Sequence, residues 1–446
     1  MNAPFLTEVD PEIAVKGSID PLGLLPLWSR YGRQVVGNLS LVASSARGFT
    51  TLLLGYHFAR RLVDERDVPE ASVVEAFLKF EQLTAYSRLA AAEDRDAHPG
   101  RVLGLRRVRS RLTQSKKVRI GSSRDAQILS NQRAYGLWTL FSGPAQESGL
   151  LVRKSLRLSE DGEAFVRDIV YPRLEQAGLR DGRAILDVLR SRKWFEPRGS
   201  DEQVARLLAE LHTDEFSAQE KDFYIERFAC GGPADPGGRQ HQLWECIRAY
   251  NDEHGTWLDR FDMDQLIGVI ALAKERGYDD LHDRLWRIYR FEHVIGPASR
   301  VFGYLQVNAD DRSIHDLADD LAAKWNSGLG HVDPDALSAH LEPVEVLHQE
   351  QGVRRFETLA RSLHTGDWVA VIEAILDQNA EVMARRGGGP WIVRDRDTLQ
   401  VRHKQEGADL PEDPAGLLIH PYFLTSVKSV GGEVLGTFRE EEDDAA

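Results

Sequence analysis

Apolar and polar residues in the first quarter of the chain recur with the period of amphipathic helices. Between residues 73 and 89, apolar side chains fall at spacings of three and four, and charged side chains fill the positions between them. The preceding apolar run, residues 49–56, leads into Arg60 and Arg61, cations that suit the C-terminal end of a helix. The pattern therefore predicts helices packed on one another from about residue 20 to residue 95.

A second helical pattern covers residues 125–147, where Gly143 and Pro144 break or kink it. Two short β-prone pieces, 150–152 and 156–158, follow and predict a small hairpin. Ser159 comes next, with acidic residues directly after it. A hydroxyl at the N-cap and acidic residues in the first turn predict the start of another helix.

The middle of the chain, residues 181–386, returns to helical periodicity and carries repeated helix-start signals. Residues 200–203 and 217–220 both match the capping box. In this motif the N-cap hydroxyl accepts a hydrogen bond from a free backbone N–H, and the side chain three residues later accepts one from the backbone N–H of the N-cap residue. Glycines at 277 and 387 follow apolar-periodic stretches and predict helix ends. The pattern therefore predicts a helical domain.

The chain beyond Gly387 has a different texture. Strand-like pieces at 391–394 and 399–402 flank a short polar connection and predict a second hairpin. Five acidic residues at 440–444 predict a solvated tail.

Charge is distributed unevenly along the chain. The formal net charge is −14, yet residues 101–124 contain nine Lys or Arg and no Asp or Glu. Cations concentrated in this way indicate a surface that meets phosphates, because a polyanion relieves their mutual repulsion and releases its counterions. The alternatives are a hydrated face, cations that pair with the protein's own acidic residues, and an acidic protein partner.

The candidate nucleic-acid contacts form three groups. Cations of the basic stretch and those just ahead of the predicted 125–147 helix would bind backbone phosphates. Ser130 and the three residues after it would face base edges, and cations of the 150–158 hairpin would contact sugar-phosphate or the minor groove. The three groups comprise Arg106, Arg107, Arg109, Arg111, Lys116, Lys117, Arg119 and Arg124; Asn131, Gln132 and Arg133; and Arg153, Lys154 and Arg157.

Residues 122–170 also carry a short motif. A helical pattern, Gly149-Leu150, a basic hairpin and then Leu158, Ser159, Gly162 and Phe165 match the order in which a wing strand enters an L-[ST]-x-x-G-x-x-[LF] segment. The stretch resembles the wing of winged-helix regulators, and this resemblance implies binding to duplex DNA. As a long, acidic, mainly helical chain with one basic insert and no recognisable catalytic motif, the whole sequence is loosely similar to accessory proteins of bacterial anti-phage defence clusters.

These patterns predict a mainly α, multi-domain protein with a winged-helix-like insert and a small β-containing C-terminal unit. A chain of 446 residues exceeds the size that one hydrophobic core usually reaches. We expect an N-terminal helical domain at 1–98, a basic winged-helix-like domain at 99–180 and a helical domain at 181–386. A small β-containing unit with the acidic tail is expected at 387–446.

Sequence motifs for catalysis or cofactors are mostly missing. There is no G-x-x-x-x-G-K-[ST], no H-E-x-x-H and no G-x-S-x-G, and the two cysteines lack the spacing of a zinc site or a disulfide framework. His-Asp dipeptides at 282–283 and 315–316 are expected on exposed helix sides. We therefore assign no catalytic residue, metal or cofactor, and a metal-dependent nuclease without a linear motif stays an alternative.

Aromatic residues are assigned mainly to the core. Six tryptophans in or beside helical stretches are predicted to be core anchors. Trp391 and the 420–423 stretch are also predicted to pack internally, with base stacking as the alternative. The six tryptophans are Trp138, Trp194, Trp244, Trp257, Trp286 and Trp325.

The first residues are acidic, and no early segment is apolar enough for a bilayer span, so we expect a cytoplasmic protein without membrane contact. The sequence predicts a non-enzymatic subunit of a larger bacterial complex that binds duplex DNA, with an ATPase or nuclease subunit as its partner. A protein-interaction scaffold without nucleic-acid contact is the main alternative.

Overall fold

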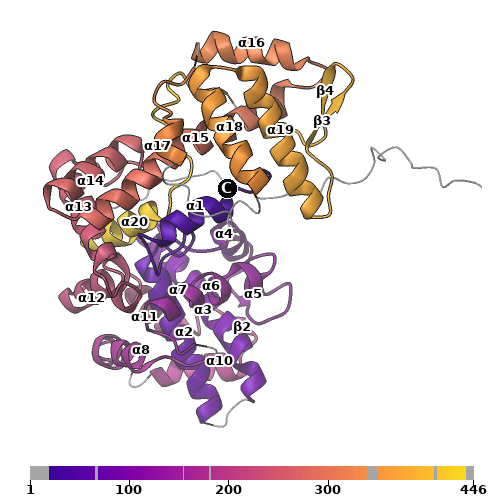
Figure 1. Cartoon of the computed structure of the whole chain (residues 1–446). Coiled ribbons are helices and arrows are strands. Elements are labelled where there is room, and N and C mark those ends of the chain that lie inside the picture. The colour runs from indigo at the N-terminus through magenta and orange to yellow at the C-terminus, as the bar shows by residue number, and fades with distance from the viewer. Residues whose placement is uncertain are drawn as a thin grey trace, which may run out of the picture. The chain divides into compact units, whose positions relative to one another are not determined.

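The computed structural model describes residues 20–65, 69–153, 155–179, 182–326, 328–338, 350–405 and 409–437 (Figure 1). The fold is mainly helical, as the sequence patterns predicted. In these ranges the strands form two short antiparallel pairs. The predicted acidic tail at 440–444 and candidate Lys154 lie outside the described residues. No helix in these ranges is long and apolar enough to cross a bilayer.

The chain divides into two compact units, each built from segments distant in sequence. The first, here the 262–422 unit, combines Asp262–Tyr422 with the described residues up to Gln34. The second, here the 35–261 unit, combines Val35–Phe261 with the segment that begins at Phe423. Residues 99–180, which were predicted to form a separate domain, share the 35–261 unit with the helices before and after them.

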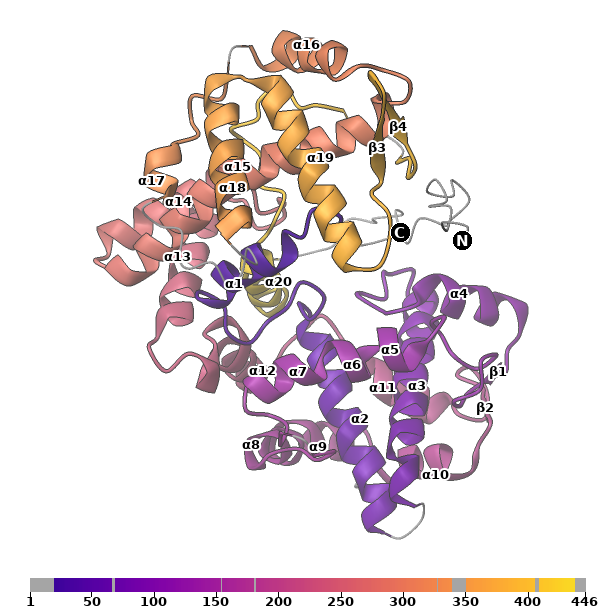
Figure 2. The same cartoon turned by 45° about the vertical axis from the view of Figure 1, so that its right-hand side comes forward.

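The 35–261 unit is built around α2 (Ala46–Asp64) and α3 (Val73–Asp94), which lie side by side (Figure 2). Both helices are buried over most of their length. Its other elements are η1 (Glu70–Ser72), α4 (Leu105–Gln114), β1 (Val118–Arg119), α5 (Gln132–Tyr135), α6 (Leu137–Leu140), α7 (Ser142–Glu147), α8 (Glu160–Ala164), η2 (Phe165–Val170), α9 (Tyr171–Gln176), α10 (Arg183–Ser191), β2 (Trp194–Phe195), α11 (Glu202–Glu210), α12 (Ala218–Tyr224), η4 (Ile225–Ala229), η5 (Gly232–Ala234), α13 (Arg239–His254) and α20 (Leu424–Leu435).

Close packing and capping hold α2 in place. A Cβ added at Gly55 would lie 2.7 Å from the Phe77 ring, so α2 and α3 can approach this closely only with glycine there. At the start of α2, the Glu433 carboxylate of α20 accepts hydrogen bonds from the backbone N–H groups of Ala46 and Arg47. A carboxylate at a helix N-terminus accepts hydrogen bonds from free N–H groups and interacts favourably with the helix dipole. These bonds from α2 to Glu433 hold α20 in this unit.

The 262–422 unit contains one helix of 30 residues, α15 (Asp279–Asn308), against which several others pack. Its hairpin, β3 (Ile392–Asp395) with β4 (Thr398–Val401), confirms the predicted one, and Asp395 faces Thr398 across the turn. The remaining helices are α1 (Leu25–Arg33), α14 (Met263–Glu275), α16 (Ile314–Trp325), α17 (Pro334–Ser338), α18 (Glu350–Thr365) and α19 (Trp368–Arg385).

The structure corrects one predicted helix and one predicted cap. Residues 125–147 do not form a single helix: α5, α6 and α7 are separate, and Gly136 between α5 and α6 is extended. A Cβ at Gly136 would lie 2.4 Å from the Gln132 carbonyl oxygen, which explains why the chain breaks at a glycine. The predicted box at 200–203 is also wrong, because Asp201 is the N-cap of α11 and makes no side-chain cap bond.

Other local predictions hold. Ser159 caps α8 by accepting the Gly162 N–H at 3.2 Å, and Ser217 forms the predicted capping box with Glu220. The 150–158 hairpin reduces to one antiparallel bridge, Leu151 with Leu158, and a 3.1 Å hydrogen bond from the Val152 N–H to the Arg157 carbonyl. The resemblance of 122–170 to a winged-helix region stays a prediction.

Candidate nucleic-acid interface

The helix α4 carries the first part of the basic stretch on its exposed face. Only Val108 and Leu112 of this helix are buried, one turn apart, and α4 packs on α3 in the 35–261 unit (Figure 2). At the N-cap, Gly104 has a φ of 74°, and a Cβ there would lie 2.4 Å from the Ile128 carbonyl oxygen. This sharp entry and two-residue anchor leave Arg106, Arg107 and Arg109 of α4 exposed to solvent.

Five cations of residues 101–124, which we call the basic segment, are exposed and meet no Asp or Glu side chain in the described part of the chain. Arg106 and Arg109 lie on α4, Lys116 and Lys117 lie in the loop after it, and Arg124 follows β1. The alternative in which cations of the basic segment pair with the protein's own carboxylates therefore does not apply to these five. Their charges are available to an anionic partner.

The other candidate cations of the basic segment are partly engaged. Arg107 is exposed and donates to the Gln127 carbonyl at 3.3 Å. Arg111 is half-buried and donates to the Tyr86 hydroxyl at 3.0 Å and to the Ala126 carbonyl at 2.8 Å. These bonds fasten the loop after β1 to α3 and α4, so Arg111 positions the surface.

Arg119 is the candidate in this group that pairs with a carboxylate, that of Asp125. Both side chains are about half exposed, at 45% and 56%. An exposed pair of this kind contributes little to stability and is screened by salt, so a stronger anion can replace Asp125.

The three predicted base-reading residues have three different environments. Asn131 is exposed and caps α5, accepting the Ala134 N–H at 3.2 Å. Arg133 is exposed on α5. Gln132, in contrast, is fully buried. The assignment of Gln132 to base reading is therefore wrong, because its amide cannot reach a ligand at the surface.

Gln132 instead belongs to a buried polar layer beneath the basic segment. Its Nε2 donates to the Glu81 carboxylate at 2.6 Å, and its Oε1 accepts from Gln82 Nε2 at 2.8 Å. Gln82 also holds Gly121 by two bonds, to its N–H at 2.8 Å and to its carbonyl at 2.9 Å. Two side chains of α3 thus fix both α5 and the loop that follows β1.

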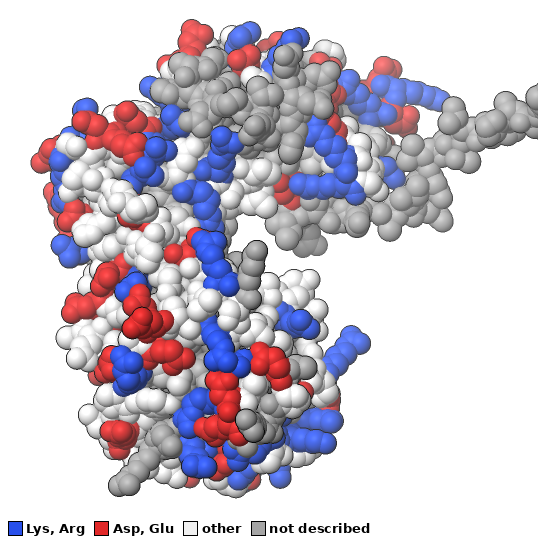
Figure 3. Space-filling model, turned by 60° about the horizontal axis from the view of Figure 1, so that its bottom comes forward, with Lys and Arg blue, Asp and Glu red and all other residues white. Residues whose placement is uncertain are grey.

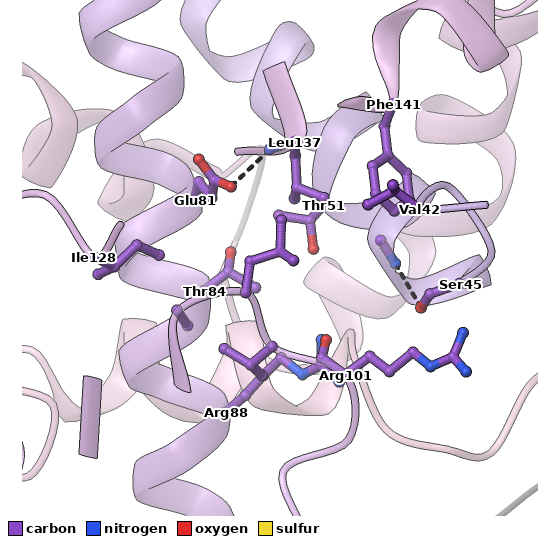
Figure 4. A pocket seen from close by; sticks show the side chains of 14 residues that line it. Val42, Ser45, Thr51, Glu81, Thr84, Arg88, Arg101, Ile128, Leu137 and Phe141 are labelled. Atoms are coloured by element: carbon purple, nitrogen blue, oxygen red, sulfur yellow. Dashed lines mark hydrogen bonds between the residues drawn. The ribbon is translucent and has the colours of Figure 1, made fainter. Parts of the chain in front are cut away.

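Glu81 in this layer has a strongly perturbed acidity. Burial raises its pKa from about 4.5 to about 7, although the N–H of Leu137 and the Gln132 amide favour the charged form. The Leu137 N–H donates to Glu81 Oε1 at 2.9 Å, the dashed line at the upper left of Figure 4. A small shift in pH near neutrality therefore changes the charge beneath the surface.

A cavity of about 80 Å³ adjoins Glu81 in the same unit (Figure 4). Thr84 of α3 and Thr51 of α2 line it together with apolar side chains such as Ile128 and Phe141. The Thr84 hydroxyl is buried and has no hydrogen-bond partner among the described residues. The cavity lies beneath the chain that leads into α4, because residues 101–103 form part of its wall.

The two predicted wing cations that the structure describes, Arg153 and Arg157, are held by carboxylates. Arg153 pairs with Glu147 at 2.7 Å, and Arg157 pairs with Asp64 of α2 through both terminal nitrogens, at 3.2 Å and 3.1 Å. Arg153 and Arg157 therefore contribute less free positive charge than the sequence indicates.

Figure 3 shows how Lys, Arg, Asp and Glu side chains are distributed over one face of the molecule. On the face shown, Lys and Arg side chains are intermixed with Asp and Glu over most of the area, and several cationic side chains project at the lower right. The face shown is therefore not uniformly positive.

The other candidate residues, which are possible metal ligands and aromatic residues, do not form a site among the described residues. Among the described residues, no three His, Cys, Asp or Glu side chains gather closely enough to hold a metal ion. His282 Nδ1 lies 3.1 Å from its exposed neighbour Asp283, and Asp316 caps α16. Trp391, Tyr422 and Phe423 are buried, which confirms the predicted core packing.

Trp194 was assigned to the core, and the structure shows that this is wrong. Its side chain is 47% exposed on β2. The sequence held a signal, since Arg190, Arg192 and Lys193 precede it, and an aromatic residue among cations is typical of nucleic-acid surfaces. Comparison with protein-family models, curated proteins and solved structures finds no match to this chain.

Proposed function

We propose that the chain binds nucleic acid, in the first place duplex DNA, through the exposed cations of the basic segment. The observation that carries the proposal is that five cations lie at a solvent-exposed surface without a carboxylate partner in the described residues. Free like charges repel one another, and binding to phosphates removes that repulsion while releasing counterions. The helix α4 and the loop after it supply these phosphate contacts.

The proposal places the chain in a larger bacterial complex as a non-enzymatic subunit, with an ATPase or nuclease as partner. Its support is the absence of common catalytic motifs from the sequence, together with the resemblance to winged-helix regulators and to anti-phage defence accessory proteins. The wing cations are secondary in this proposal because Glu147 and Asp64 already hold Arg153 and Arg157.

Salt-dependent binding to a labelled DNA duplex tests the proposal. The double variant Lys116→Glu and Lys117→Glu should bind at least about tenfold more weakly, and the slope of log K against log salt should fall by about two. Arg106→Glu with Arg109→Glu should act in the same way, because those side chains also face solvent.

The matched control is Arg167→Glu with Arg206→Glu, which makes the same charge change at exposed positions of the same unit outside the basic segment. For this control, the slope of log K against log salt should fall by less than half as much as for the Lys116/Lys117 variant. Equal losses for the control and the Lys116/Lys117 variant would show that only net charge matters. Lack of duplex binding by the unaltered chain would favour the scaffold alternative, and cleavage of the duplex with Mg²⁺ or Mn²⁺ would favour a nuclease.

A further inference from the structure

A small two-stranded sheet presents an aromatic side chain within the cationic surface. In the pairing of β1 with β2, Val118 lies opposite Phe195, and Arg119 lies opposite Trp194. Val118 and Phe195 are buried, while Arg119 and Trp194 are 45% and 47% exposed. Because successive side chains of a strand point to opposite faces, the sheet anchors one face in the core and presents Arg119 and Trp194 to solvent.

Cations flank this tryptophan on both strands. Lys117 directly precedes β1 and is exposed, and Lys116 is its exposed neighbour in the loop. Lys193 directly precedes Trp194, is exposed, and meets no carboxylate in the described ranges. Its backbone carbonyl accepts the Ile120 N–H at 2.9 Å, which keeps it beside β1.

The acidic side chains near Trp194 do not cancel this charge. Asp125 pairs with Arg119, and Asp201 pairs with Arg192, so each neutralises a different cation. Glu196, two residues after Trp194, is half-buried. Exposed cations at Lys116, Lys117 and Lys193 therefore lie next to the two-stranded sheet that carries Trp194.

We propose that Trp194 is a stacking platform for an unpaired nucleobase, with Lys116, Lys117 and Lys193 binding the phosphates on either side of that base. The proposal rests on the nucleic-acid binding proposed above and specifies its ligand. An exposed tryptophan offers an apolar face that every base can cover, and the surrounding cations favour a polyanion. The bases of a blunt duplex are stacked on one another, so a single strand or an overhang should bind more tightly.

The test compares fluorescence anisotropy of labelled single strands of DNA and RNA, a blunt duplex and a single strand of abasic sugar-phosphate, all of one length. Trp194→Ala should weaken binding to the base-bearing single strands by about 5- to 150-fold, because each base stacked on an aromatic ring is worth about 1–3 kcal/mol. Duplex and abasic strand should bind the variant and the unaltered chain equally.

Two further variants separate stacking from folding. Trp194→Phe keeps a ring and should retain intermediate affinity for the single strand. Leu258→Ala removes another large apolar side chain that is 60% exposed in the same unit and should change nothing. Thermal unfolding of each variant shows that the unit is intact.

The outcomes distinguish the two proposals. If the unaltered chain binds the duplex with salt dependence, and Trp194→Ala leaves single-strand affinity unchanged, the stacking platform is refuted while the phosphate surface stands. If the abasic strand binds as tightly as the base-bearing strand, stacking is likewise refuted. If no polyanion binds, both proposals fail. Dependence on Trp194 with either DNA or RNA supports the platform, and the tighter strand identifies the ligand.

Discussion

Two groups of cations in the 35–261 unit carry the same charge in different surroundings. In the turn between Leu151 and Leu158, Arg153 and Arg157 meet carboxylates, whereas Arg106 and Lys116 of the basic segment meet none in the described residues. The difference lies in what the fold brings near: Asp64, the partner of Arg157, is 93 residues away in sequence. Local counting of charges therefore cannot separate a structural cation from a ligand-binding one.

Arg47 is the extreme case of a cation held by the fold. It is 1% exposed, and it donates to Glu220 at 2.7 Å and to the carbonyls of Thr213 and Glu215 at 2.7 Å and 2.8 Å. Its guanidinium also lies 3.7 Å from the centre of the Phe216 ring. A buried charge needs this degree of satisfaction, whereas the exposed cations of α4 are solvated by water.

Replacing Arg47 should give the largest effect. Arg47→Leu leaves two part-buried carbonyls without their donor and the buried Glu220 carboxylate with Arg173 alone, so the free energy of unfolding should fall by about 3–5 kcal/mol. Arg106→Leu, on the exposed face of α4, should change it by less than about 0.5 kcal/mol. Urea denaturation of both variants checks this contrast, and equal losses would contradict it.

The second-largest effect should be a dependence of the free energy of unfolding on pH that arises from Glu81. Burial raises the pKa of Glu81 to about 7, so the folded state binds this proton more tightly than the unfolded chain does. Its stabilising contribution is complete below pH 4.5, is lost as the pH rises to about 7 and stays lost above, a change on the order of 3 kcal/mol.

Glu81→Gln removes this titration. Urea denaturation across that pH range should show a flatter dependence for the variant than for the unaltered chain. Two curves that run parallel would show that Glu81 does not titrate in this window.

Gln132 and Arg133 are neighbours that should behave oppositely. Gln132→Leu leaves Gln82 and Glu81 with unmet hydrogen bonds and should cost about 2 kcal/mol in unfolding free energy. Arg133→Ala should leave stability within about 0.5 kcal/mol and weaken duplex binding modestly. Denaturation and anisotropy on the same two variants measure both effects. A stable Gln132→Leu variant would refute the role of the buried layer.

The smallest effect is expected at Asp64. Asp64→Asn removes the carboxylate that holds Arg157 and lowers the free energy of unfolding by less than about 1 kcal/mol, because exposed pairs are weak. The released guanidinium should raise duplex affinity up to a few-fold and steepen its salt dependence slightly. Unchanged affinity would show that the turn lies outside the bound surface, and Asp168→Asn provides a matched control.

Sequence periodicity was sufficient for much of the fold. It predicted the mainly helical class, the β3–β4 hairpin and the caps at Ser159 and Ser217, since each depends on neighbours within a few residues. It predicted a helix over 125–147 that breaks or kinks at Gly143 and Pro144, and it missed the break at Gly136, because that break depends on backbone crowding that an apolar pattern does not record.

The sequence by itself determined that nine cations are concentrated in residues 101–124. Tertiary structure alone decided which of them are available, since Arg111 turns toward Tyr86 while Arg106 and Arg109 face solvent. It also buried Gln132 and exposed Trp194, reversing the roles predicted for both. The physical reason is that burial and pairing depend on groups brought together from distant segments, whereas composition and periodicity depend only on order along the chain.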